Sequence, residues 1–194
     1  MIEKIVANFQ ETTKKFSEKI PEFSKDKENS KNIPDFKDYS SGITRSEVDK
    51  DVEDKKIEEK SPYSKEINEN ITTEEELNVY LEAELEENTV NDKPALTRGD
   101  IDCEQVDENT GETNLERMEK GKPPLDKDGN PVELHHIGQE SDSPLAELSR
   151  NEHRGKGNDS ILHEKTQDTL IDRKAFEKEK TAHWKARAEE MKQG

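Results

Sequence analysis

In the C-terminal half of the chain stand the residues Asp128-Gly129-Asn130-Pro131-Val132-Glu133-Leu134-His135-His136. The Asp-Gly-Asn triplet predicts a tight turn, and the alternating residues 131–134 predict a short strand that ends at the histidine pair. Neighbouring side chains of a strand point to opposite faces, so one imidazole can bind a metal ion while the other acts as a base. The pattern indicates a metal-dependent hydrolytic site at this strand end.

The residues that follow predict two further elements of that site. Residues 145–148 (Leu-Ala-Glu-Leu) predict a second strand, and residues 151–165 predict a helical segment that carries His153 and His163. Gly155 and Gly157 lie between these histidines, so the segment must bend. The order strand, strand and helix suits a phosphodiesterase with one metal ion, and the spacing leaves open which of the two histidines binds it.

The composition locates the folded part of the chain. Only 26% of the 194 residues are hydrophobic, 41% are charged and the net charge is −17, too little apolar material for a core over the whole length. Residues 121–194 carry 13 Lys and Arg against 15 Asp and Glu, whereas residues 1–120 carry 18 against 33. All five histidines lie after residue 134. The acidity therefore belongs to the N-terminal part and the chemistry to the C-terminal part.

Hydropathy, charge and helix-capping patterns divide the chain into four parts. Residues 1–20 predict one amphipathic helix, which suits packing on its own domain as well as docking, and residues 21–70 predict a disordered acidic linker. Residues 71–110 predict a helical segment, with a helix from Thr73 to about Asn88 and a loop over 93–102. Residues 111–194 form the predicted catalytic domain, which begins with a capped helix at Thr113.

Cysteine and hydropathy exclude other protein classes. The single Cys103 excludes an intramolecular disulfide framework and a CxxC zinc site. No apolar stretch reaches the length of a signal peptide or of a membrane span. We therefore expect a protein without a membrane-spanning segment, and one that does not use a standard secretory signal.

The motifs around the histidine pair resemble a known nuclease family. They are Glu133-Leu134-His135-His136-Ile137-Gly138-Gln139, Ser143-Pro144-Leu145-Ala146-Glu147-Leu148, Glu152-His153-Arg154, Ile161-Leu162-His163 and His183-Trp184-Lys185. In residue types and order, roughly residues 100–190 resemble the LHH branch of the HNH/endonuclease-VII (His-Me finger) nucleases. That resemblance implies an α+β fold: a small ββα-metal domain with flanking helices, here preceded by the largely disordered acidic N-terminal region.

The resemblance also implies roles for four histidines. His135 matches the metal-binding first histidine of the motif, and His136 matches the general base that activates water. His153 and His163 match the later positions that complete the site around one divalent ion, Mg, Zn or Ni. His183, beside Trp184, is assigned to packing or the surface instead.

Basic residues near the C-terminus indicate a surface for the phosphate backbone of nucleic acid. A solvated helix face is the alternative interpretation. Asn158 is a candidate for positioning the active-site loop, although helix capping explains it equally well. The candidate contacts to nucleic acid are Arg154, Lys174, Lys178, Lys185 and Arg187.

The expected function is a metal-dependent endonuclease that cleaves DNA. By the resemblance it is the toxin part of a bacterial polymorphic toxin with a cognate immunity protein. It would be made in the bacterial cytoplasm, exported by a specialised route and active in the cytoplasm of the target cell. The alternatives are an RNase on the same fold and a non-catalytic interaction protein whose histidines hold a structural metal.

Overall fold

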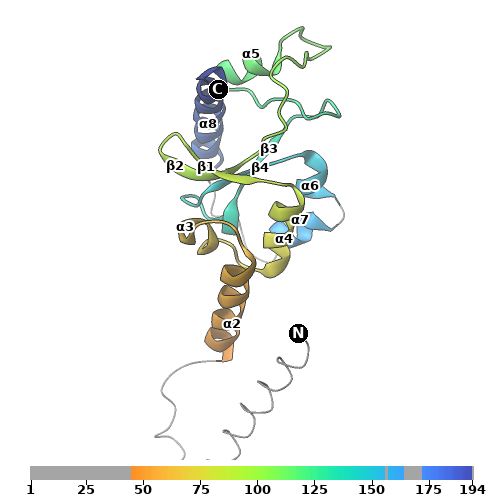
Figure 1. Cartoon of the computed structure of the whole chain (residues 1–194). Coiled ribbons are helices and arrows are strands. Elements are labelled where there is room, and N and C mark those ends of the chain that lie inside the picture. The colour runs from red at the N-terminus through yellow and green to blue at the C-terminus, as the bar shows by residue number, and fades with distance from the viewer. Residues whose placement is uncertain (1–44, 156, 164–171, 194) are drawn as a thin grey trace, which may run out of the picture. The chain divides into compact units, whose positions relative to one another are not determined.

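The computed structural model describes residues 45–155, 157–163 and 172–193, which belong to one compact unit (Figure 1). In chain order its elements are α2 (Arg45–Lys60), α3 (Lys65–Asn68), α4 (Glu74–Glu82), β1 (Glu86–Val90), β2 (Lys93–Thr97), α5 (Asn114–Glu119), β3 (Glu133–His136), the 3₁₀ turn η2 (Ile137–Gln139), β4 (Leu145–Leu148), α6 (Arg150–Arg154), α7 (Asn158–Leu162) and α8 (Arg173–Gln193). None of the helices described is long and apolar enough to cross a membrane.

Four short strands form one mixed sheet in the order β1-β2-β4-β3. The β1–β2 and β3–β4 pairs are antiparallel, and β2 and β4 are parallel. All four residues of β4 are buried, because helices cover both faces of the sheet. The strand that carries the histidine pair, β3, lies at the edge of the sheet beside β4.

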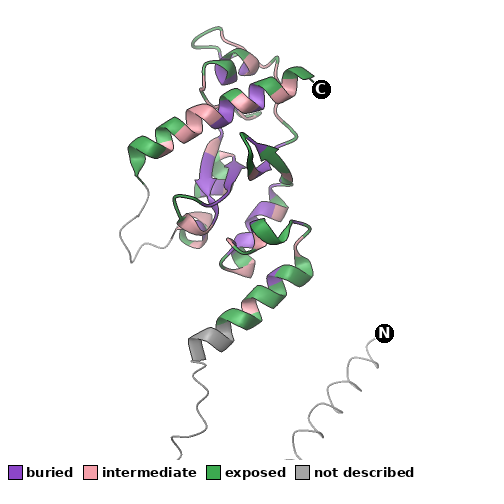
Figure 2. Ribbon diagram, turned by 90° about the vertical axis from the view of Figure 1, so that its left-hand side faces the viewer, coloured by how far each residue is buried: buried purple, intermediate pink, exposed green. Residues whose placement is uncertain are grey.

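Separate hydrophobic clusters fill the two sides of the sheet. One includes Leu148 of β4 and Leu162 of α7, together with apolar residues of α3 and α4. The other includes Leu134 of β3 and Trp184 of α8, together with residues of α5. Figures 1 and 2 show α8 on one side of the sheet and α4 and α7 on the other. The two faces of β3 therefore point into different surroundings.

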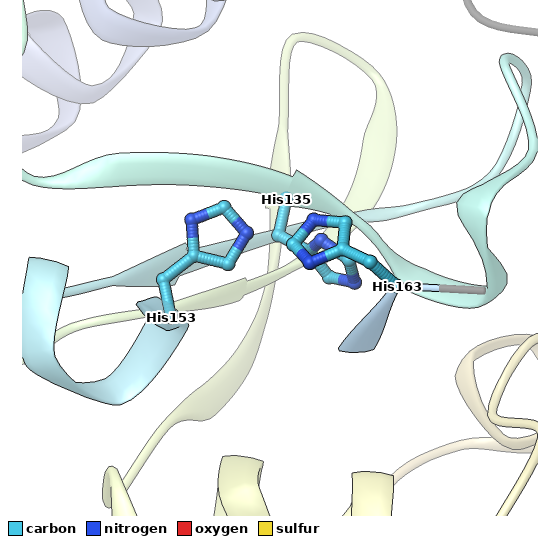
Figure 3. A group of neighbouring side chains, drawn as sticks. All are labelled: His135, His153 and His163. Atoms are coloured by element: carbon cyan, nitrogen blue, oxygen red, sulfur yellow. The ribbon is translucent and has the colours of Figure 1, made fainter. Parts of the chain in front are cut away.

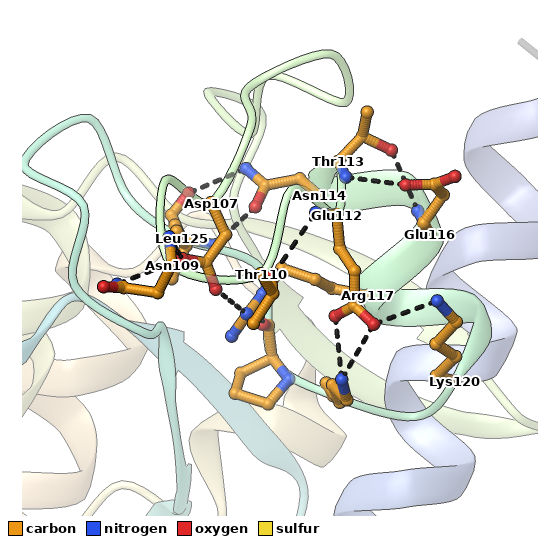
Figure 4. Close-up of polar contacts among 12 residues, drawn as sticks. Asp107, Asn109, Thr110, Glu112, Thr113, Asn114, Glu116, Arg117, Lys120 and Leu125 are labelled. Atoms are coloured by element: carbon orange, nitrogen blue, oxygen red, sulfur yellow. Dashed lines mark hydrogen bonds and ion pairs between the residues drawn. The ribbon is translucent and has the colours of Figure 1, made fainter.

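Polar contacts hold the long connection between β2 and β3 (Figure 4). The fully buried Asn114 side chain accepts from the backbone N–H of Leu125 and donates to its carbonyl, at 2.7 and 2.9 Å. Arg117 binds Asp107 through Nη1 at 2.5 Å. The predicted capping box at Thr113 is confirmed, with Glu116 as its partner.

The strands around the histidine pair agree with the sequence, while the residues before them differ. The strand predicted over residues 145–148 is confirmed as β4, and the one predicted over 131–134 lies two residues later, as β3. The helix predicted to continue to Asn88 ends at Glu82, and residues 86–97 form a hairpin instead. Asn91 and Asp92 adopt left-handed backbone angles at its turn, which these residue types tolerate. The hairpin joins residues 86–97 to the sheet of the predicted 111–194 domain.

Part of the predicted disordered linker is also helical. Over residues 45–68 the prediction for residues 21–70 is wrong, because α2 and α3 lie there. The sequence of helix α2 is mostly charged, and Ile57 is the one large apolar side chain that it buries among those described. Hydrophobic periodicity therefore could not reveal this helix. The amphipathic helix predicted over residues 1–20 and the linker up to residue 44 lie outside the described residues.

Candidate metal centre

Three of the predicted histidines come together beside β3 (Figure 3). His135 lies on β3, His153 on α6, and His163 directly after α7. Their ring centroids are 4.9 to 5.1 Å apart, and one nitrogen from each ring lies within 4.8 Å of the others. Helix α6 ends at Gly155 and α7 begins after Gly157, so the two helices are separate and both later histidines can face the same strand residue. Both His153 and His163 are therefore candidate metal ligands beside His135.

The electrostatics of the cluster suit a bound cation. His135 Nε2 and His153 Nε2 are buried and have no hydrogen-bond partner, which is a costly state for polar atoms. Burial, reinforced by the neighbouring imidazoles, lowers the pKa of His135 well below its usual value. Burial also lowers the pKa of His153, although the hydrogen bond to Glu133 opposes this. Neutral imidazoles with free lone pairs are the form that binds a metal.

A carboxylate that was not predicted as a site residue orients the cluster. Glu133 Oε2 lies 2.6 Å from His153 Nδ1, so the other nitrogen of that ring is left for a metal. Burial alone would raise the pKa of Glu133, but hydrogen bonds from Arg154 and His153 outweigh it and lower the pKa. Partners of this kind are usual behind metal-binding histidines. The signal was present in the sequence, because Glu133 and His135 are two residues apart on one strand and share a face.

His136 lies on the opposite face of β3, against α8. Its side chain is 1% exposed, and its ring centroid lies 4.4 Å from that of Phe176. Nε2 is 3.0 Å from Glu179 Oε2, and Nδ1 is buried without a hydrogen-bond partner. The histidine pair therefore divides as the strand pattern predicts: one ring joins the cluster, and the other keeps a free nitrogen apart from it.

Comparison with known proteins agrees with this arrangement. Residues 113–190 match the family LHH, described as a nuclease of the HNH/ENDO VII superfamily with conserved LHH. This segment belongs to the LHH nuclease family. The matched residues include β3, β4, α6, α7 and most of α8, and with them all five histidines. No solved structure matches the chain.

The structure corrects one of the predicted nucleic-acid contacts of the LHH domain. Arg187 is buried: its Nε donates to Glu147 Oε1 at 2.9 Å, and its Nη2 donates to the carbonyl of Arg98 at 3.0 Å. Its guanidinium therefore holds α8 onto the sheet and is not available to a phosphate. The prediction failed because a basic helix does not reveal which of its residues meet a buried carboxylate. His183, predicted to serve packing or the surface, is buried against Trp184 and lies 2.7 Å from the same Glu147 oxygen.

The other predicted cations of the LHH domain are exposed: Arg154, Lys174, Lys178 and Lys185. A groove of about 350 Å³ lies beside the histidine cluster, and its lining includes His153, Arg154, Phe176 and Lys180. Asn158 Nδ2 donates to the carbonyl of Glu152 at 2.7 Å, which fixes the start of α7 to α6. That bond holds the bend between His153 and His163.

Proposed function

We propose that this protein is a metal-dependent endonuclease that hydrolyses phosphodiester bonds of DNA. The observation that carries the proposal is the cluster of His135, His153 and His163, beside His136, within a nuclease-family domain. Two of the clustered rings have buried nitrogens without a partner, which supports a bound cation more than a purely structural histidine contact.

The three clustered histidines would hold one divalent ion. Such an ion supplies Lewis-acid stabilisation of the negative charge that develops on the phosphate and on the departing oxygen. Glu133 keeps His153 turned toward the cluster, and the Asn158 bond to Glu152 fixes α7, which precedes His163, to α6, which carries His153. Imidazole ligands suit Zn and Ni, whereas Mg prefers oxygen ligands and would need water or phosphate oxygens to complete its coordination.

His136 would act as the general base. Glu179 engages its Nε2, so its Nδ1 is the nitrogen that would take the proton from the attacking water. The exposed Arg154, Lys174, Lys178 and Lys185 would contact the phosphate backbone on either side of the reacting group.

We propose further that the nuclease is the toxin part of a bacterial toxin-immunity system. The resemblance to LHH domains of polymorphic toxins supports this, with export by a specialised route and action in the target-cell cytoplasm. Expression of the protein inside a bacterial cell should then stop growth, and the His136→Ala variant should not. Co-expression of the product of the gene directly downstream should restore growth; growth arrest that His136→Ala leaves intact would contradict the toxin assignment.

The decisive experiment is cleavage by the purified, metal-stripped full chain. Plasmid DNA and a structured RNA are each offered with Mg, Zn or Ni, and metal binding is measured by calorimetry. We expect metal-dependent cleavage of DNA, a loss of about 10²- to 10⁴-fold in His136→Ala with metal binding retained, and loss of metal binding in His135→Ala. Cleavage of RNA alone would reassign the substrate. Metal binding without cleavage of either polymer would support the non-catalytic alternative.

A further inference from the structure

The carboxylate of Glu179 joins two residues that are distant in sequence. Its Oε2 lies 3.0 Å from His136 Nε2 on β3, and its Oε1 lies 3.1 Å from Lys93 Nζ at the start of β2. Each oxygen therefore has its own partner, and the carboxylate is fixed between them. Glu179 itself stands on α8, so three elements meet at this point.

Phe176 and Glu179 of α8 both contact His136. Phe176 and Glu179 are three residues apart, so they lie on the same side of the helix. Phe176 places its ring against the His136 ring, while Glu179 reaches the edge of that ring at Nε2. The Glu179 side chain is 22% exposed and the His136 side chain 1%, so this hydrogen bond is largely shielded from water.

From this contact we infer that Glu179, held by Lys93, is a positioning residue that fixes the orientation and the tautomer of His136. An ionised carboxylate only accepts hydrogen bonds, so the proton of the neutral ring stays on Nε2. Nδ1, the buried nitrogen without a partner, then keeps its lone pair available for a proton. The inference rests on the proposed nuclease function, for which His136 is the base.

Lys93 links the site to a part of the chain before the family match. It lies outside residues 113–190, on the hairpin that pairs with the rest of the sheet. The Lys93 ammonium holds the Glu179 carboxylate in place, and Glu179 in turn holds His136. The hairpin therefore contributes to the site without touching substrate. Lys93 is more exposed than Glu179, with 55% of its side chain accessible, so its removal should have the smaller effect.

The test combines kinetics with NMR of the imidazole nitrogens in the full chain. We expect Glu179→Ala to lower kcat about 10- to 100-fold with little change in KM, and Lys93→Met to lower it less. Glu179→Gln keeps the side-chain shape but its amide can donate as well as accept, so its kcat should lie between those of wild type and Glu179→Ala. The matched control is Glu189→Gln, an exposed glutamate of the same helix whose carboxylate binds Lys192, and it should retain wild-type kcat.

The NMR arm separates a failure of the inference from a failure of the proposed function. Nitrogen shifts of His136 should show one tautomer, protonated on Nε2, in the wild type and a mixture in folded Glu179→Ala or Glu179→Gln. Wild-type kcat in Glu179→Ala would overturn the inference while cleavage itself stands. If the wild type cleaves nothing, the proposed function fails, and an unchanged His136 tautomer in both variants would overturn the positioning role as well.

Discussion

His153 Nδ1 lies 2.6 Å from Glu133 Oε2, so a strand residue orients a helix residue at the centre of the histidine cluster. Glu133 is two residues before His135 on β3, and both side chains face α6. The strand therefore supplies one candidate ligand and also the group that aims a second. Arg154 donates to the same carboxylate oxygen from the next residue of α6, at 2.8 Å.

Removing this carboxylate should weaken metal binding. We expect Glu133→Ala to raise the Kd for the divalent ion about 10- to 100-fold, because His153 loses the partner that fixes its ring. Calorimetry on the metal-stripped protein measures the change, with Glu189→Gln as the exposed control. An unchanged Kd in a folded Glu133→Ala protein would show that His153 does not need this bond to bind the ion.

The metal-free protein should lose stability as the pH falls below about 6.5. Burial lowers the pKa of His135 and of His153 in the folded state, so the unfolded chain takes up their protons first. Each histidine then removes up to about 1.4 kcal/mol from the free energy of unfolding per pH unit. Between pH 7.5 and 6.5 the effect should be small, because the histidines of the unfolded chain are then largely neutral.

Urea unfolding in EDTA at pH 7.5, 6.5 and 5.5 measures this dependence. The His135→Gln variant should show a shallower loss than the wild type, since one of the two histidines with a lowered pKa is gone. The range stays above the titration of ordinary carboxylates. Stability that is equal or greater at pH 5.5 would contradict the buried, neutral state of these rings.

Substitutions of two basic residues of α8, Arg187 and Lys185, should affect different properties: the first the stability of the protein, the second its binding of nucleic acid. Arg187→Ala leaves the fully buried Glu147 without its guanidinium and should cost about 3–5 kcal/mol of stability. Lys185 is exposed, so Lys185→Ala should change stability by less than about 0.5 kcal/mol. If it contacts phosphate, its loss should weaken DNA binding and reduce the salt slope by about one. Equal stability of the two variants would contradict the buried role of Arg187.

The sequence predicted the parts of the site that local patterns determine. A turn, an alternating strand and a histidine pair predict β3, and the glycines between His153 and His163 predict the bend that separates α6 from α7. These signals are local because a strand and a bend depend on a few neighbouring residues.

The missed parts depend on contacts between distant residues. Glu179 meets His136 across 43 positions, and Arg187 meets Glu147 across 40, so no spacing rule in one sequence could pair them. The hairpin over residues 86–97 was missed because Pro94 argues against a strand. Pro94 is accommodated because pairing of β2 with β4 begins only at Ala95.

Gly138, two residues after His136, should tolerate no side chain. Its φ is +71°, and a Cβ built there would lie 2.4 Å from the carbonyl oxygen of Asn70, a backbone atom that cannot rotate away. Gly129 is a matched control, since its φ is +77° and nothing lies within 4 Å of its Cβ position. Gly129→Ala should therefore cost only the backbone strain, about 1 kcal/mol, and Gly138→Ala clearly more.

The same pair of variants tests whether residues before the family match support the site. Asn70 follows α3, so the clash in Gly138→Ala would push the turn after the histidine pair away from this segment. We expect Gly138→Ala to lower cleavage even at temperatures where it remains folded, because a shift of about 1 Å in a catalytic group can cost about 100-fold in rate. Gly129→Ala should cleave at the wild-type rate under the same conditions. Equal unfolding temperatures and equal rates for the two variants would mean that the turn moves freely and that Asn70 does not restrain it.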